Sequence, residues 1–546
     1  MLDIPELDQM VCRRLSPHDL AQCAQVSKKW WSIVTPHIWS DLSWLCSTTG
    51  PHKQLGAFYM MVLEDYHNRK RQRKPQAPTT TQPPPRSPIL SKYGYWIRIL
   101  PEPRDDRSPS PRTRIGQQKA QEASRLFIHL LNHCSPDVQV SRLTLHTKDV
   151  DLSPHHPRRT VLGLTLPRVR RLSIAVDFYS RNAEISNLMA LLDQCSTILE
   201  KLQISVQIPP WCREGNKDKE RAQDEPKCFP ALKELNLRQC ALFSTDAEEF
   251  WPWLWKRCGS VEKMVVDSCS VEEQSLSQSM MAYMPKLSEI TLGKGLASYI
   301  SDFMAAAVLS GSRNGWKKVR VGPYAFFERA AMDALATHTS TLEVLEINGE
   351  DFSINDLIEV LRSCTNLHTL SIKNTVLGPM GRRSSFKAEM FIDQDHNTDS
   401  LKAWKCESSL RVLHVHITDI PRPGQQSQRD EDNFSGQGRE LQNKVYERLA
   451  RFSNLETLQL GTRRRNWLGM SLGNGLEKLS GLKKLKKLGV RGMAMTRLGV
   501  KEAQWMTEHW PQLRTIVGSR DVIATEFVAW LRGNHPNVHV FIPRGV

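Results

Sequence analysis

The segment LKELNL at residues 232–237 decides the fold of this chain. It has apolar residues at its first, fourth and sixth positions, and the same spacing returns between residues 140 and 518. The thirteen copies have as their middle apolar residues Leu143, Leu172, Leu202, Leu235, Met264, Ile290, Val319, Leu345, Leu370, Leu413, Leu458, Leu488 and Ile516. Most successive copies lie 25 to 33 residues apart. Such recurrence predicts a stack of similar units that share one continuous core.

Each copy is expected to form a short strand. Alternate side chains of a strand face opposite sides, so the apolar residues face the core and the variable residues face outward. Between copies the apolar spacing becomes helical, as in residues 183–196 and 354–364. The chain is therefore predicted to be an α/β solenoid, with parallel strands on the concave face and helices on the convex face. Its period is somewhat above the roughly 20 to 29 residues typical of leucine-rich repeats, and a helix in each unit favours their longer subclass.

Cysteines follow the same repeat. Four of them end a predicted helix just before the next strand, namely Cys134, Cys195, Cys258 and Cys364. We expect these to be buried turn residues and not metal ligands or nucleophiles. Cys240 and Cys269 each follow the last apolar position of a copy by three residues. In LRQCAL this resembles the cysteine-containing repeats of ribonuclease inhibitor and of F-box leucine-rich repeat proteins.

Residues 4–42 read IPELDQMVCRRLSPHDLAQCAQVSKKWWSIVTPHIWSDL. This stretch resembles an F-box in its Ile-Pro start, its apolar helix positions and its SPHDL turn. The resemblance implies a small all-α module that binds a Skp-type adaptor and, through it, a cullin ligase. It places at the adaptor Ile4, Pro5, Leu7, Val11, Leu15, Leu20, Val26 and Trp30. The basic pair Arg13-Arg14 departs from the family pattern, and the alternative interpretation is a plain helical cap on the first repeat.

The order of segments predicts how the domains are arranged. An F-box-like helical domain at 1–45 is followed by a helix and a disordered basic, proline-rich linker at 46–91, a first repeat strand at 92–100, a disordered insertion at 101–120 and the solenoid at 121–546. Longer gaps between copies predict insertions near 376–405 and 420–440, which either carry recognition or are untethered surface loops. The run RKRQRK at 69–74 fits a nuclear localisation signal and a solvated charge cluster equally.

The net charge of +16 favours acidic partners. Variable strand positions on the predicted concave face hold the candidate partner-binding residues Arg238, Lys373, His414, His416 and Arg491. The sequence has no GxxxxGK[ST], GxSxG, HExxH or CxxC motif. We therefore expect no enzyme activity and no cofactor, and we name no catalytic, cofactor-binding or metal-binding residue.

These features together predict the substrate-recognition subunit of a Skp-cullin-F-box ubiquitin ligase, whose repeats bind an acidic or phosphorylated protein. The alternative is a leucine-rich repeat scaffold that binds acidic protein partners without ubiquitin. Nucleic acid is not an expected partner, since a recognition helix and an aromatic-basic motif are both missing. The chain has neither a secretory signal nor an apolar run long enough for a membrane span, which predicts a location in the cytoplasm, the nucleus or both.

Overall fold

The structure is a computed structural model. Described are residues 12, 20, 22–23, 34, 143–146, 170–177, 189, 192–193, 195–207, 228–238, 250–267, 273–293, 300–348, 352, 354–372, 386–394, 400–418, 420, 431–461, 468–490, 498–520 and 522–542. The chain divides into two compact units, Met1–Val261 and Glu262–Val546. Each unit is treated separately below. The predicted linker at 46–91, the strand at 92–100 and the insertion at 101–120 lie outside the described residues.

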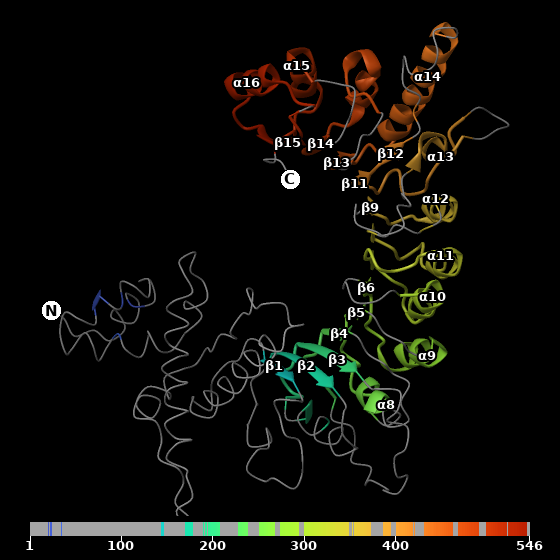
Figure 1. Cartoon of the computed structure of the whole chain (residues 1–546), viewed down its shortest axis with the longest axis vertical. Coiled ribbons are helices and arrows are strands. Elements are labelled where there is room, and N and C mark those ends of the chain that lie inside the picture. Colours follow the sequence, from blue (N-terminus) through green and yellow to red (C-terminus); the bar gives the residue numbers. More distant parts are fainter. Residues whose placement is uncertain are drawn as a thin grey trace, which may run out of the picture. The chain divides into compact units, whose positions relative to one another are not determined.

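The first unit contains four parallel strands that follow one another in sequence order (Figure 1). They are β1 (Leu143–His146), β2 (Arg171–Asp177), β3 (Lys201–Gln207) and β4 (Glu234–Arg238). The predicted middle residues are in register, with Leu172 paired with Leu143 and Leu202, and Leu202 paired with Leu235. One helix, α8 (Phe250–Trp255), follows β4 and buries Phe250, Trp251, Leu254 and Trp255.

The second unit continues the pattern with ten parallel strands. They are β5 (Lys263–Asp267), β6 (Glu289–Leu292), β7 (Lys318–Val321), β8 (Val344–Ile347), β9 (Thr369–Ile372), β11 (Val412–Val415), β13 (Thr457–Leu460), β14 (Lys487–Val490), β15 (Thr515–Gly518) and β16 (His539–Phe541). The predicted middle residues from Met264 to Ile516 pair with one another strand by strand. Each is at most 1% exposed. The recurring pattern thus determines both the strands and their register.

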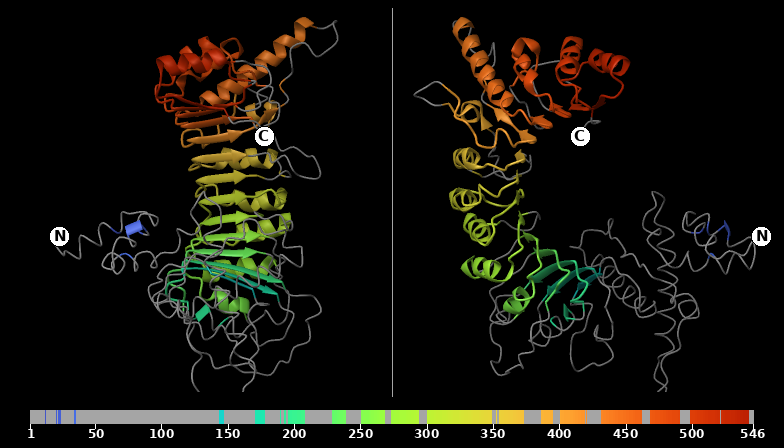
Figure 2. Two further views of the ribbon diagram at one scale, coloured as in Figure 1. Left: turned by 60° about the vertical axis from the view of Figure 1, so that its left-hand side comes forward. Right: turned by 180° about the vertical axis from the view of Figure 1, so that it is seen from behind.

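In this unit helices cover one face of the sheet (Figure 2). They are α9 (Glu273–Tyr283), α10 (Asp302–Ser310), α11 (Arg329–Ala336), α12 (Ile354–Ser363), α13 (Ala388–Ile392), α14 (Glu431–Ala450), the 3-10 helices η6 (Leu472–Asn474) and η7 (Leu476–Gly481), α15 (Val500–His509) and α16 (Thr525–Asn534). Helix α12 coincides with the helix predicted from residues 354–364. A parallel sheet with helices on one face confirms the predicted α/β solenoid.

Polar side chains connect neighbouring repeats at both ends of the helices. The carboxylate of Asp302, in the first turn of α10, accepts hydrogen bonds from the backbone N–H groups of Glu328, Ala330 and Ala331 at 2.7, 2.9 and 3.1 Å. It therefore caps the N-terminus of α11 in the next repeat. At the opposite edge, Asn314 donates to the carbonyl of Pro285 at 2.7 Å, and equivalent bonds join Asn366 to Ser340 and Asn454 to Ser408.

The two predicted insertions contain regular structure. Strand β9 pairs directly with β11, so residues 373–411 lie outside the ladder, and within them β10 (Phe386–Lys387) and α13 form. Strand β10 pairs with β12 (Ile417–Thr418) in a small second sheet. The second predicted insertion, 420–440, overlaps the start of α14 at Glu431. The strand β16 was not predicted, because VHVF keeps only a fragment of the repeat spacing.

Candidate functional site

Described residues of the N-terminal module form a small apolar cluster. Cys12, Leu20 and Val34 are 2%, 5% and 0% exposed and pack together, with Cys23 partly buried against them. Leu20, expected at the adaptor, is therefore part of this cluster. The other residues expected at the adaptor are Ile4, Pro5, Leu7, Val11, Leu15, Val26 and Trp30, and they lie outside the described residues. Their contact with an adaptor stays a prediction.

Charged residues on the strand face of β6 to β8 neutralise one another. Lys318 Nζ lies 2.5 Å from the Glu289 carboxylate on β6, and Arg320 Nε lies 3.4 Å from the Glu346 carboxylate on β8. The first unit has the same arrangement, with Lys201 Nζ on β3 2.7 Å from the Glu234 carboxylate on β4. Pairing across neighbouring strands leaves little net charge on this stretch of the face to attract an acidic partner.

The predicted partner-binding residues occupy different environments. His414, on β11, is partly buried, and its Nδ1 lies 3.2 Å from the hydroxyl of Ser371 on β9. His416 follows the end of β11 and is 3% exposed. Arg238 is the last residue of β4 and is partly buried. Lys373 and Arg491 lie outside the described residues. Partner binding by this set stays a prediction.

One row of residues on the strand face is apolar over the last three strands. It consists of Gly489, Val517 and Phe541, at equivalent positions on β14, β15 and β16, and Phe541 is 59% exposed. The row before it is polar and consists of Lys487, Thr515 and His539. A Cβ at Gly489 would lie 2.9 Å from Cγ of Gln459, so glycine allows the neighbouring side chain to lie over the strand. The strand face near β16 therefore has one exposed apolar side chain, Phe541, beside polar residues.

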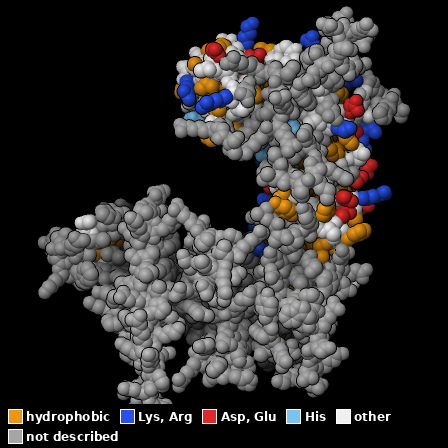
Figure 3. Space-filling model, in the orientation of Figure 1, with side chains coloured by type: hydrophobic (Ala, Val, Ile, Leu, Met, Phe, Trp, Pro, Cys, Tyr) orange, Lys and Arg blue, Asp and Glu red, His pale blue; other side chains and the backbone are white. Residues whose placement is uncertain are grey.

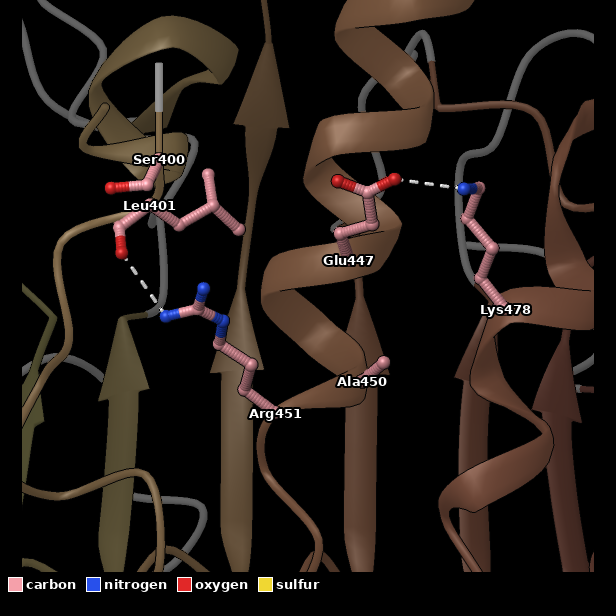
Figure 4. Close-up of a pocket in the computed structure, with 6 residues that line it drawn as sticks. All are labelled: Ser400, Leu401, Glu447, Ala450, Arg451 and Lys478. Carbon is pink, nitrogen blue, oxygen red and sulfur yellow. Dashed lines mark hydrogen bonds and ion pairs between the residues drawn. The ribbon is translucent and has the colours of Figure 1, made fainter. Parts of the chain in front are cut away.

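An open pocket of about 530 Å³ lies among α14, η7 and the segment at Ser400 and Leu401 (Figure 4). Glu447 and Lys478 form an ion pair of 2.8 Å on one side of it. On the other side Arg451 Nη1 donates to the Leu401 carbonyl at 3.1 Å. The lining contains no thiol or imidazole. Its charged and polar side chains allow the pocket to hold a polar group.

Buried thiols belong to the framework and not to a reactive centre. Cys195, Cys258 and Cys364 are each 0% exposed. Cys364 directly follows α12, and Cys258 lies three residues after α8. Cys134 lies outside the described residues. Burial raises the pKa of Cys195 and Cys364 to about 12, and it raises the pKa of Cys258 further. A thiol with so high a pKa stays protonated and is a poor nucleophile or metal ligand. Among the described residues no three His, Cys, Asp or Glu side chains form a group that could hold a metal ion.

A buried polar network that was not predicted lies beside the insertions. Arg448 on α14 is 0% exposed and donates to the Glu407 carboxylate and to the Ile392 carbonyl, both at 2.5 Å. Asp393, at the end of α13, accepts from Arg362 Nε at 2.8 Å and from Trp404 Nε1 at 3.0 Å. These bonds tie α12, α13 and α14 together. Charged residues on a helix usually face solvent, so their positions alone could not show this burial.

Comparison with known proteins gives a family match for the N-terminal segment. Residues 5–43 match the F-box-like family. No curated protein matches the chain. The fold is similar to that in the crystal structure of the yeast Rad7 and Elc1 complex, at 11% identity and a TM-score of 0.36 over 77% of each chain. It is also similar to the Leptospira interrogans leucine-rich repeat protein LIC12759, at 13% identity and a TM-score of 0.27 over 69% of this chain and 91% of that one.

No helix in the described part of the chain combines the length and the apolar character that crossing a membrane requires.

The repeat ladder has the features expected of a leucine-rich repeat solenoid, since short parallel strands alternate with helices, mostly at a period of similar length. The chain therefore combines an F-box-like domain at its N-terminus with a solenoid of the leucine-rich repeat kind.

Proposed function

We propose that this protein is the substrate-recognition subunit of a Skp-cullin-F-box ubiquitin ligase. The observation that carries the proposal is the F-box-like match at residues 5–43, followed by a repeat solenoid. An F-box-like domain suggests a receptor role through a Skp-type adaptor, and proteins of this kind are non-catalytic. The chain would contribute proximity alone, by holding a target protein near a separate enzyme that transfers ubiquitin.

The second unit suits such a role because its repeats are firmly joined. Each strand is hydrogen-bonded to its neighbours in register, and side chains such as Asp302 and Asn314 join one repeat to the next. A repeat protein with well-packed interfaces behaves as one extended body, which presents many exposed positions to a single target. The receptor therefore has a large surface that can be specific without a deep cavity.

The adaptor contact can be tested by co-purification of the full-length protein with a Skp-type adaptor. Pro5→Ala combined with Leu7→Ala should lower adaptor recovery about tenfold, since both side chains lie in the matched segment and apolar anchors dominate such interfaces. Pro285→Ala combined with Pro511→Ala, at exposed turns of the second unit, is the matched control and should not change recovery. Equal recovery of the first variant and the wild type would count against the receptor role.

A ubiquitin-independent scaffold for acidic partners is the second candidate, and the net charge of +16 favours it. The two functions differ in the fate of the bound protein. A receptor shortens the lifetime of its target, whereas a scaffold leaves that lifetime unchanged. Removing the protein from cells and measuring the half-life of proteins that co-purify with it separates the two.

A further inference from the structure

The edge of the second unit at which the strands begin carries an exposed basic stretch. Along this edge the residue before each strand accepts a backbone hydrogen bond from the next repeat: Glu456 N–H donates to Arg411 O, Lys486 N–H to Glu456 O, and Arg514 N–H to Lys486 O, at 2.7 to 2.9 Å. These four residues therefore lie side by side in consecutive repeats of the ladder. Figure 3 shows Lys and Arg side chains on the surface of the C-terminal repeats.

Cations outnumber carboxylates in this stretch. Arg411, Lys484, Lys486 and Arg514 are all exposed, and Glu456 is the one carboxylate among them. Within the described part of the chain, the guanidinium groups of Arg411 and Arg514 form no ion pair. The four cations and Glu456 are called the basic edge below. Helix C-termini at this edge favour nearby cations, but that effect is weak at exposed positions and does not require four of them.

The cations of the basic edge act on the carboxylate of Glu456. Its carboxylate accepts a hydrogen bond from Lys486 Nζ at 2.8 Å. This bond, together with the charges of Lys486, Arg411 and Lys484, lowers the pKa of Glu456 despite some desolvation. Lys484 is held by the Asn454 side chain, with Nζ 2.6 Å from Oδ1. The positive field therefore already stabilises one anion of the chain itself and can stabilise others.

We propose that the basic edge binds an extended acidic segment of a partner protein. The spacing of the cations favours a linear anion, because neighbouring strands lie about 4.8 Å apart and the stretch from β11 to β15 spans roughly 14 Å. A single phosphate needs donors that converge on one point, whereas these side chains are spread over four repeats. An extended peptide of about five residues covers that length and offers a carboxylate at alternate positions.

An acidic peptide fits this edge better than a nucleic acid. Proteins that bind single strands stack bases on exposed aromatic side chains. Near the basic edge the ring of Trp510 is 1% exposed and donates its Nε1–H to the Leu479 carbonyl, while Trp505 stacks on His509 with 4.6 Å between ring centroids. The five residues of the basic edge include no aromatic side chain on which a base could stack.

This inference deepens the proposed function, because it assigns a chemical class to the target segment. It relies on the proposed function only for the statement that the bound protein is a ubiquitylation target. Binding of an acidic peptide is measured without the adaptor, so the two ideas can fail separately. The Pro5→Ala and Leu7→Ala variant should keep peptide binding, and the basic-edge variants should keep adaptor binding.

The test uses the full-length protein and a fluorescein-labelled peptide of alternating glutamate and serine, about nine residues long, with binding followed by fluorescence anisotropy. The triple variant Arg411→Glu, Lys486→Glu and Arg514→Glu should weaken binding about tenfold or more, and wild-type binding should weaken between about 50 and 300 mM salt. Glu456→Gln should tighten binding about threefold, since it removes the competing carboxylate. A gain of affinity cannot result from misfolding.

The matched control reverses three exposed cations at the same edge near β6 and β7, in Lys286→Glu, Arg313→Glu and Lys317→Glu. It makes the same change in net charge and should leave binding within about twofold of the wild type. Equal weakening in both triple variants would show that only overall charge matters and would overturn the proposal. So would unchanged binding in the basic-edge variant, or tighter binding of a single-stranded oligonucleotide than of the peptide.

Discussion

The repeats from β6 to β9 and the stretch from α13 to α14 are held together in different ways. In the regular repeats, each unit is connected to the next by apolar anchors in register. Contacts near the surface, such as the Asp302 cap on α11, add to this connection. The insertion-bearing stretch instead uses one fully buried charge, that of Arg448, which lies between α13 and the Glu407 segment. Regular repeats are positioned by packing on neighbours of the same design. Inserted segments have no such neighbour, and specific polar contacts fix them on the solenoid.

The largest expected effect comes from breaking the buried network. Arg448→Ala should lower the free energy of unfolding by about 3 kcal/mol, because the partly buried Glu407 carboxylate and the Ile392 carbonyl would both lose a fully buried donor. Hydrogen exchange followed by mass spectrometry should show that Arg448→Ala speeds exchange, relative to the wild type, more in α13 and α14 than in α10 and α11. Arg439→Ala, exposed on the same helix, is the control and should change stability by less than about 0.5 kcal/mol. An equal increase in exchange in both stretches would contradict the contrast drawn here.

A smaller effect is expected in the regular repeats. Asp302→Ala removes the acceptor for three backbone N–H groups at the start of α11 and should cost about 1 kcal/mol, as for other helix caps. Urea unfolding measures this loss. Asp333→Ala serves as the comparison, since Asp333 is an exposed residue of α11 whose ion pair with Arg329 is 3.9 Å long. A loss with Asp302→Ala no greater than with Asp333→Ala would show that the cap contributes nothing.

The mildest expected effect is a dependence on acid that is confined to the insertion-bearing stretch. Burial raises the pKa of Asp393, but hydrogen bonds from Arg362 and Trp404 and the charges of Arg362 and Arg448 outweigh it, so the pKa lies below its ordinary value of 3.8. The stability from this carboxylate is therefore complete above about pH 4 and is lost as the pH falls through the lowered pKa.

Thermal unfolding of the wild type and of Asp393→Asn between about pH 3 and 7 checks this sign. The variant should be less stable than the wild type at pH 7, and the difference should shrink as the pH falls below about 4. Glu389→Gln, exposed in the first turn of α13, is the control for loss of a nearby carboxylate. A difference that grows in acid would mean that Asp393 is protonated in the folded protein.

The sequence predicts the ladder closely because one apolar spacing encodes both a strand and its register. Leu345 and Leu370 show this, since both are predicted middle residues and they pair with each other across β8 and β9. Binding residues are harder to predict, because the same outward position can be paired, buried or exposed. Lys318 is neutralised by a neighbouring strand, His416 is buried, and Arg411 is exposed. These outcomes depend on residues about thirty positions away, which a local pattern does not contain.

Strand β16 has a consequence for the protein in solution. It pairs with β15 on one side, and among the described strands nothing pairs with its other side. An open strand edge is a template onto which another chain can add and start aggregation, and proteins limit that risk by keeping edge strands very short. At three residues, β16 offers too few backbone groups to recruit a foreign strand firmly. The degraded end of the repeat pattern thereby protects the solenoid from uncontrolled growth.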